Sequence, residues 1–390
     1  DVENEYFSDG LTEELLNVLA QIKEIKVAGR TSSFAFKGKD EDLRLIGEKL
    51  NVAHLLEGSV RKAGNRVRVT AQLIKSDDGY HLWSQTYDRQ LNDVFAIQED
   101  IAEQVVDALK VTLLGVEAQR LARTPTESAE AHDAYLLGRH VILRNSFESL
   151  KQAENHFKEA LRLDPEYAEA WAALAKAYLR QINTGATTKE AGHPRADEAL
   201  NTAIELNPDL AEAYSVRATY HLQRDEDDLA ANALERALEL QPNNVDAAQG
   251  FASLMNQKGD FESALDWNAR ALALDPLWPG LTWQRANLFQ LLHRDDDALR
   301  AFGRLREIAP DSPLGYYGPA LMHYFGTGRM DEAVKWYARS SEVDPSDYEL
   351  YSYAALAFTH IGDFEAAEAW LEAAERVGPG QSMPHLARTA

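Results

Sequence analysis

Seven prolines recur along this chain at a nearly constant spacing. Each closes a stretch such as LRLDP, IELNP or LELQP, and successive prolines lie 43, 34, 34, 34, 35 and 34 residues apart. A period of this length is typical of a helical hairpin that is stacked again and again. Such an array builds a curved scaffold, which usually holds another molecule rather than transforming it. The prolines are Pro165, Pro208, Pro242, Pro276, Pro310, Pro345 and Pro379.

Small residues recur at fixed places within each period. When the proline is counted as position 32, alanine occupies position 20 of every unit, and Ala or Gly usually occupies position 8. Small side chains let two helices approach closely, and proline ends the second helix because it cannot donate the next backbone hydrogen bond. Each unit is therefore predicted to be a helical hairpin with a defined end. The position-20 residues are Ala153, Ala196, Ala230, Ala264, Ala298, Ala333 and Ala367.

The pattern resembles the tetratricopeptide repeat family over residues 131–379, since aromatic residues also recur at positions 4 and 11. Two units depart from the family pattern. The second carries nine extra residues, placed between its helices at residues 183–194, and the first has a helix-turn about three residues longer. In the fifth and sixth units Leu305 and Ser340 replace the usual alanine of position 27. We expect looser or differently spaced packing there.

The first 115 residues, called the front domain below, follow another pattern. Apolar residues at helical spacing behind capping residues predict three helices. Alternation of Val67, Val69, Ala71 and Leu73 with polar residues predicts a strand with one wet face, and hairpin turns flank it. The predicted helices cover residues 10–22, 40–50 and 95–114, and the predicted strands cover residues 25–30, 54–62, 66–75 and 80–87.

Long segments of the front domain resemble the TolB amino-terminal-like domain. They are YFSDGLTEELLNVLAQI, RTSSFAFKGK, LLEGSVRKAGNRVRVTAQLIKSDDGYHLWSQTYDR and VFAIQEDIA, within residues 5–113. In that family an apolar strand usually precedes the YFSDGL segment, so the resemblance implies one vacant sheet position in this chain. It also implies that such a domain precedes tetratricopeptide repeats in bacterial signalling proteins. Those proteins commonly carry, upstream, a membrane segment and a class III nucleotide cyclase or a CadC-type winged-helix regulator.

Composition excludes several kinds of function. The net charge of −23 arises from 63 acidic and 40 basic residues, and a surface this acidic repels phosphate backbones, so nucleic acid is not an expected partner. Without cysteine the chain has no disulfide, thiolate metal site or cysteine nucleophile. No apolar run approaches the roughly 20 residues that cross a bilayer. Because the sequence begins without Met, we interpret it as a piece of a longer protein, whose anchor would lie upstream.

No residues have the spacing of a catalytic or metal site. The segment 37–39 lacks the glycine spacing of a phosphate loop, and the eleven histidines show no HExxH motif. Acidic runs at residues 225–228 and 295–297 lack the ligand pattern of a calcium loop, so we interpret them as solvated turns that cap helices. We therefore predict no catalytic residue, no metal and no cofactor in this chain.

The family resemblance implies a binding groove. In tetratricopeptide repeats the first helix of each unit lines the inner surface through positions 2, 5, 9, 12 and 13. Amides that pair with peptide backbone, beside aromatic rings that cover apolar side chains, suit a bound protein or peptide segment. The predicted groove residues are Lys176, Arg180, Gln249, Ser253, Asn256, Gln257, Trp283, Asn287, Gln290, Tyr317, Tyr324 and Phe325.

The predicted fold is an α+β front domain, with a small mixed sheet and helices, followed by an all-α superhelical solenoid of tetratricopeptide repeats. The expected boundaries are residues 1–115 for the front domain, 116–130 for a linker, 131–379 for seven repeats and 380–390 for a tail.

Three hypotheses for function follow. The first is a non-catalytic sensory or protein-interaction module of a bacterial signalling protein, which binds a protein or peptide in the groove. The second is a fragment of a membrane-anchored class III adenylate or guanylate cyclase whose catalytic domain lies outside this chain. The third is a free-standing envelope assembly scaffold. The first two place the chain on the periplasmic side of an inner membrane, with a cytoplasmic location as the alternative.

Overall fold

The computed structural model describes residues 2–90, 93–111, 113 and 123–378. Residues 116–122 of the expected linker and the expected tail lie outside the described residues. The chain divides into two compact units, Asp1–Lys258 with Ala273–Pro276, and Gly259–Leu272 with Leu277–Ala390. A small sheet precedes a solenoid of helices, and the chain is 69% helical, so the predicted fold class is confirmed.

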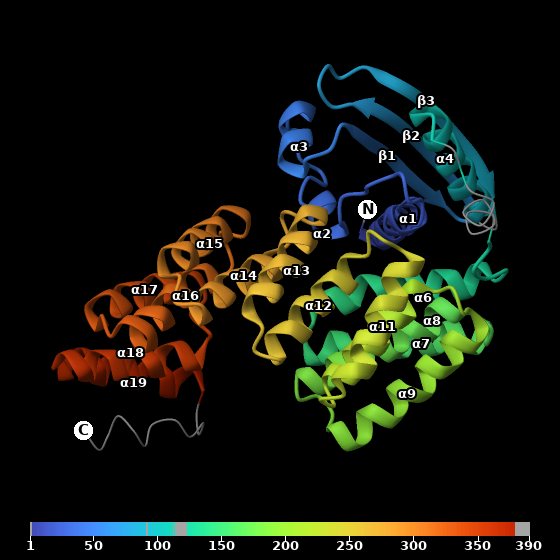
Figure 1. The fold of residues 1–390 in the computed structure, drawn as a ribbon. Helices are drawn as coiled ribbons and strands as arrows, with labels where there is room; N and C mark the ends of the chain where they lie inside the picture. The colour runs from blue at the N-terminus through green and yellow to red at the C-terminus, as the bar shows by residue number, and fades with distance from the viewer. Residues whose placement is uncertain (1, 91–92, 112, 114–122, 379–390) are drawn as a thin grey trace. The chain divides into compact units, whose positions relative to one another are not determined.

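The front domain contains an antiparallel sheet with strand order β1-β2-β3. Figure 1 shows the three strands side by side with helix α4 against the sheet, and the apolar residues Val67, Val69, Ala71 and Leu73 of β2 are buried as their alternation predicts. The elements are α1 (Val2–Ala20), α2 (Arg30–Phe34), α3 (Leu43–Leu50), β1 (His54–Ala63), β2 (Arg66–Lys75), β3 (His81–Gln90) and α4 (Val94–Leu109).

Two predictions for the front domain need correction. Helix α1 begins well before residue 10, and residues 25–29 form no strand, so the sheet is antiparallel rather than mixed. The backbone of this segment bonds to the repeats instead of to a strand. The Gly29 amide donates to the Leu274 carbonyl at 2.6 Å, and the Asn243 side chain donates to the Ile25 carbonyl at 3.3 Å.

Strand β1 lies at an edge of the sheet, and no described strand pairs with its outer side. Apolar side chains of α1, α3, β1 and β2 line a cavity of about 1060 Å³ there, among them Leu15, Leu19, Ile46, Leu56 and Val69. The sheet position that the family resemblance leaves vacant is therefore not filled by another described segment.

The described part of the solenoid consists of helices that follow one another in pairs along the chain, and each pair is called a hairpin below (Figure 1). The first helix of each hairpin is called the inner helix below. The pairs are α6 (Ala129–Val141) with α7 (Phe147–Leu163), α8 (Ala168–Asn183) with α9 (Lys189–Leu206), α10 (Ala211–Leu222) with α11 (Asp227–Leu240), α12 (Val245–Gln257) with α13 (Phe261–Leu274), α14 (Pro279–Leu291) with α15 (Asp295–Ile308), α16 (Leu314–Leu321) with α17 (Met330–Val343), and α18 (Tyr348–Ile361) with α19 (Phe364–Val377). A short 3-10 turn, Ile142–Arg144, follows α6, and a π-helical segment, Met322–Thr327, follows α16.

The periodic alanines are core residues. All seven at position 20 are at most 4% exposed, so each packs within the core. The loops before the prolines repeat a hydrogen bond in which the side chain before the proline accepts from the amide two residues later. This bond joins Asp164 to Glu166 at 3.0 Å and Asp344 to Ser346 at 2.9 Å. Local sequence therefore fixes both the helix pair and its end.

The irregular second repeat absorbs its extra residues by lengthening its helices, and α9 has 18 residues with Pro194 inside it. In the sixth repeat, Pro319 lies inside α16 and cannot donate to the Gly315 carbonyl. Arg306 donates to that carbonyl instead, at 2.7 Å. Both Leu305 and Ser340 are fully buried, so position 27 stays in the core although its side chains differ.

Packing at position 20 can be tested within one helix, because α13 carries a buried Ala264 and an exposed Ala269. We expect Ala264→Leu to overpack the hairpin and lower the free energy of unfolding by about 1–3 kcal/mol. The control Ala269→Leu should leave it nearly unchanged. Urea titrations of both variants measure this difference, and equal effects would contradict the core role of Ala264.

Candidate partner-binding surface

The twelve predicted groove residues fall on four inner helices and the π-helical segment after α16, in two groups. Lys176, Arg180, Gln249, Ser253, Asn256 and Gln257 belong to the first compact unit, on α8 and α12. Trp283, Asn287, Gln290, Tyr317, Tyr324 and Phe325 belong to the second, on α14, α16 and the π-helical segment. The two groups differ in whether their polar atoms already have partners.

The first group is largely engaged within the chain. Arg180 donates to the Ile142 carbonyl at 2.9 Å, and Gln249 donates to the hydroxyl of Ser253 at 3.3 Å. Gln257 donates to Asp225. Asn256 differs, since its side chain is exposed and makes no hydrogen bond with another described residue. Most of these residues therefore stabilise the solenoid and are not free to bind a ligand.

Ion pairs cross the inner surface of the first repeats in a regular register. Arg139 of the first repeat donates to Glu212 of the third at 2.7 Å, and Lys176 of the second donates to Asp246 of the fourth at 3.2 Å. If three extra residues are allowed for in the first repeat, both cations occupy position 9 and both carboxylates occupy position 2. Each pair thus joins repeats two apart. The cation at position 9 and the carboxylate at position 2 two repeats later are both visible in the sequence, but their pairing was not predicted.

The front domain joins this ladder through helix α1. Glu13 pairs with Arg139, and Arg30 donates to the other oxygen of Glu13 at 2.9 Å. Burial alone would raise the pKa of Glu13, but the charges of Arg139 and Arg30 outweigh it and lower that pKa. Burial would likewise lower the pKa of Arg139, and Glu13 and Glu212 raise it well above its ordinary value. Glu13 and Arg139 therefore both stay charged in this buried site.

A second set of polar contacts joins the front domain to helix α6. Lys62 of β1 donates to Asp133 at 2.6 Å, and the Tyr6 hydroxyl donates to the same carboxylate at 2.8 Å. Glu14 lies 2.9 Å from Nε2 of the buried His132. Polar side chains of the front domain thus bond directly to polar side chains of α6.

A third contact involves the loop that closes the fourth repeat. Asp275 is 3% exposed and accepts hydrogen bonds from the amides of Ser32 at 2.7 Å and Thr31 at 3.3 Å, as well as from the Ser32 hydroxyl. Burial raises the pKa of Asp275, while these hydrogen bonds act against the rise. A β-carbon at Gly29 would lie 2.4 Å from the Asp275 side chain, so this close approach requires glycine.

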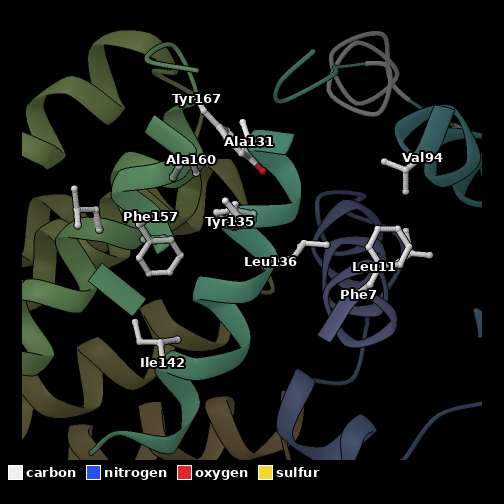
Figure 2. Close-up of a cluster of buried hydrophobic side chains, with 14 of the residues drawn as sticks. Phe7, Leu11, Val94, Ala131, Tyr135, Leu136, Ile142, Phe157, Ala160 and Tyr167 are labelled. Atoms are coloured by element: carbon white, nitrogen blue, oxygen red, sulfur yellow. The ribbon is translucent and has the colours of Figure 1, made fainter. Parts of the chain in front are cut away.

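Apolar packing supports the same interface. Figure 2 shows Leu136 of α6 directed toward Phe7 and Leu11 of α1, and the three side chains belong to one buried cluster that continues into the first repeats. Gly10 permits the approach, because an added β-carbon would lie 2.5 Å from the Leu136 side chain. The front domain therefore occupies part of the inner surface of the first repeats.

Four residues of the second group have polar atoms without a hydrogen-bond partner among the described residues, whereas the Tyr324 hydroxyl lies 3.4 Å from Nδ1 of His360. The side chains of Trp283, Asn287, Gln290 and Tyr317 are half-buried and make no hydrogen bond with another described residue. The ring of Trp283 packs 5.6 Å from that of Phe302, which fixes its orientation. These side chains present an indole N–H, two amides and a phenol from successive inner helices.

Four rings form what is called the aromatic patch below: Tyr324, Phe325, Tyr353 and His360. Ring centroids of Tyr324 and Phe325 lie 4.7 Å apart, those of Phe325 and Tyr353 lie 5.6 Å apart, and those of Tyr324 and His360 lie 5.7 Å apart. The π-helical segment supplies the first two rings, and Phe325 remains 65% exposed. Large exposed apolar side chains that gather in one place commonly mark a binding surface.

Neither metal chemistry nor a membrane span emerges from the described part of the chain. Within it, no group of three His, Asp or Glu residues could hold a metal ion. No described helix is both long enough and apolar enough to cross a membrane.

Comparisons with known proteins agree with this architecture. Residues 147–184, 189–245 and 217–277 match models of the tetratricopeptide repeat. The repeats of this chain are tetratricopeptide repeats. All residues matched by these models lie in the solenoid, so the resemblance of the front domain to the TolB amino-terminal-like domain remains a prediction.

Two curated relatives and one solved structure illustrate the likeness. A 175-residue stretch, 45% of this chain, is 39% identical to "Putative adenylate cyclase 3" of Rhizobium meliloti (strain 1021) and covers 30% of that protein. Tetratricopeptide repeat protein 5 of Bos taurus is 26% identical over 82% of this chain and 60% of its own length. The APC/C hetero-tetramer Cut9-Hcn1 shares the fold over 76% of this chain and 55% of that one, with a TM-score of 0.51 and 15% identity. The chain thus spans less than two thirds of each relative.

The buried ion chain predicts a strong effect of one substitution. Arg139→Met leaves Glu13 and Glu212 buried without their shared partner, so the free energy of unfolding should fall by about 3–5 kcal/mol. Amides of α1 should also lose protection from hydrogen exchange. In the control Arg162→Met, an exposed ion pair with Glu159 is lost, and neither observable should change. Unchanged protection of α1 in Arg139→Met would contradict the docking.

Glu169, at an inner position of the second repeat, has a buried carboxylate oxygen without a hydrogen-bond partner. Burial, helped by the nearby Glu212 and Glu14, raises its pKa from 4.5 to about 7, although its own backbone amide and Arg123 act in the opposite direction. The folded state therefore binds this proton more tightly than the unfolded state. Its contribution to stability is complete below the unfolded value and is lost as the pH rises toward 7.

Glu169→Gln should remove this pH dependence, because glutamine stays neutral. We expect the variant to unfold with a free energy about 1–3 kcal/mol higher than the native chain at pH 8 and nearly equal at pH 4.5. Urea titrations at both pH values measure the difference. The exposed Glu166→Gln serves as the control and should show no such change. A native chain that is more stable at pH 8 than Glu169→Gln would exclude a raised pKa.

Proposed function

We propose that this chain is the partner-binding part of a bacterial signalling protein, and that the inner helices of repeats 5–7 bind a protein or peptide segment. The observation that carries the proposal is the contrast between the two groups of groove residues. Polar atoms of the first group are mostly engaged within the chain, whereas Trp283, Asn287, Gln290 and Tyr317 hold donors without partners beside exposed aromatic rings. Aromatic residues at such positions are frequent hot spots of binding.

A second proposal concerns the whole protein from which the chain comes. The 39% identity to a protein named as an adenylate cyclase covers only 30% of that protein, so a catalytic domain of that kind would belong to another part of such a protein. The chain itself would be non-catalytic and would pass a binding event to that domain. Its resemblance to TolB-like signalling proteins supports a location outside the cytoplasm. Fusion of alkaline phosphatase to the full-length protein tests the location, since the enzyme is active only there.

Site-specific photo-crosslinking tests the binding surface. A benzoylphenylalanine at position 290 should give discrete adducts in the source cell, because the native side chain bonds to no described residue. The same group at position 249, whose native glutamine bonds to Ser253, should give few or none. Equal adducts from both positions, or none from position 290, would contradict the proposal.

A conservative substitution tests one residue of the same surface. Tyr317→Phe removes only a hydroxyl that bonds to no described residue, so the melting temperature should not change. If that hydroxyl bonds to the partner, its removal should weaken binding of the segment identified by crosslinking by about fivefold. Such a loss is typical of one hydrogen bond. Isothermal titration with the identified segment measures it. An unchanged affinity for Tyr317→Phe would remove this residue from the site.

A further inference from the structure

We infer that the segment bound by repeats 5–7 is uncharged and extended, and that proline or aromatic side chains anchor it. The inference rests on the proposed function and specifies the chemistry of its partner. The binding surface of repeats 5–7 is called the inner wall below. It consists of α14, α16 with its π-helical segment, and α18.

The inner wall is almost free of charge. Its helices and the π-helical segment contain two charged residues, Arg285 and Glu349. The inner helices α6, α8, α10 and α12 of the first four repeats contain nine. The inner helices of the first four repeats thus carry charges that pair within the chain, whereas the inner wall offers mainly uncharged contacts.

A charged ligand would fit the inner wall poorly. A charge that leaves water without meeting an opposite charge costs several kcal/mol. Arg285 occupies position 7, outside the groove positions 2, 5, 9, 12 and 13, and its guanidinium lies 5.3 Å from the ring centre of Phe289. At the start of α18, Asp347 and Glu349 both interact with the Tyr317 phenol and help to raise its pKa, after burial as the main cause. These acids and the net charge of −23 disfavour acidic segments and free carboxyl termini most strongly.

The free donors of the inner wall favour an extended backbone. A helical ligand satisfies its own backbone carbonyls, whereas an extended or polyproline segment leaves them available. Asn287, Gln290 and Tyr317 present donors at intervals along two inner helices, which suits the repeating carbonyls of such a segment. Side-chain amides would otherwise lose their hydrogen bonds with water on binding, at a cost.

The aromatic patch supplies the anchor site. Rings of Tyr324, Phe325 and Tyr353 stand nearly edge to face, and Phe325 is 65% exposed. Grooves lined by aromatic rings bind proline-rich segments, because the preformed polyproline helix loses little entropy on binding.

Selection from a library tests this chemistry without a known partner. Random twelve-residue segments, displayed with flanking sequence at both ends, are selected on the full chain. We expect the enriched pool to contain less than half as many Asp, Glu, Lys and Arg residues as the input, and an excess of proline and aromatic residues. Affinity of the strongest segment for the chain is then measured by fluorescence anisotropy.

A pair of exposed phenylalanines provides the variants. Phe325→Asp should weaken that segment by at least about fivefold, because it places a charge in the aromatic patch. Phe364 is 63% exposed but lies outside the patch, so Phe364→Asp should change the affinity by less than about twofold. If the selected segments are rich in charged residues and their binding still depends on Phe325, the inference is overturned and the proposed function stands. No enrichment, or binding that is insensitive to Phe325→Asp, would overturn both.

Discussion

Arg139 holds its charge in a buried site between two glutamates, and much of the first compact unit depends on that arrangement. One glutamate, Glu13, comes from the front domain, and the other, Glu212, comes from the third repeat. A buried guanidinium requires both charges and geometry that satisfies them, since removal of either partner leaves an uncompensated ion. The contact therefore sets where α1 lies against the first repeat and how the first repeat meets the third. Apolar packing of Leu136 against Phe7 and Leu11 follows from the same placement.

The two compact units use their inner helices for different purposes. In the first, cations and carboxylates pair with each other and with the front domain, so the polar groups stabilise the fold. In the second, the polar atoms of Trp283, Asn287, Gln290 and Tyr317 bond to no described residue, and Phe325 is 65% exposed. Proteins bury or pair charges that they need for stability, and they leave exposed apolar surface mainly where another molecule binds. We therefore propose repeats 5–7 as the part that binds a partner.

Sequence periodicity predicted most of the fold. Proline and alanine spacing predicted a solenoid of helices, and alternation in residues 66–75 predicted the bounds of β2. The prediction of a strand at residues 25–30 was wrong. The Gly29 amide bonds to Leu274 and the Ile25 carbonyl bonds to Asn243, and both partners are far away in sequence. Local propensity cannot show such a partner. The first turns of α1 were missed because Ser8 and Asp9, residue types that are typical of an N-cap, lie inside this helix.

The candidate site was predictable only in part. Family positions pointed to the inner helices, but they could not separate Lys176, which pairs with Asp246, from Asn287, which bonds to no described residue. That distinction depends on which repeats approach each other in space. The buried Asp275, which binds the amide end of α2, gave no local signal beyond its place before a repeat proline.

Zero-length crosslinking with a carbodiimide tests the docking of the front domain most directly, because it joins only a lysine and a carboxylate that already touch. Lys62 lies 2.6 Å from Asp133 across this interface, and Lys176 lies 3.2 Å from Asp246 within the repeats. Mass spectrometry of the digested monomer should find both amide bonds. If the bond between Lys176 and Asp246 forms while Lys62 never joins Asp133, the front domain does not occupy the inner surface of the first repeats.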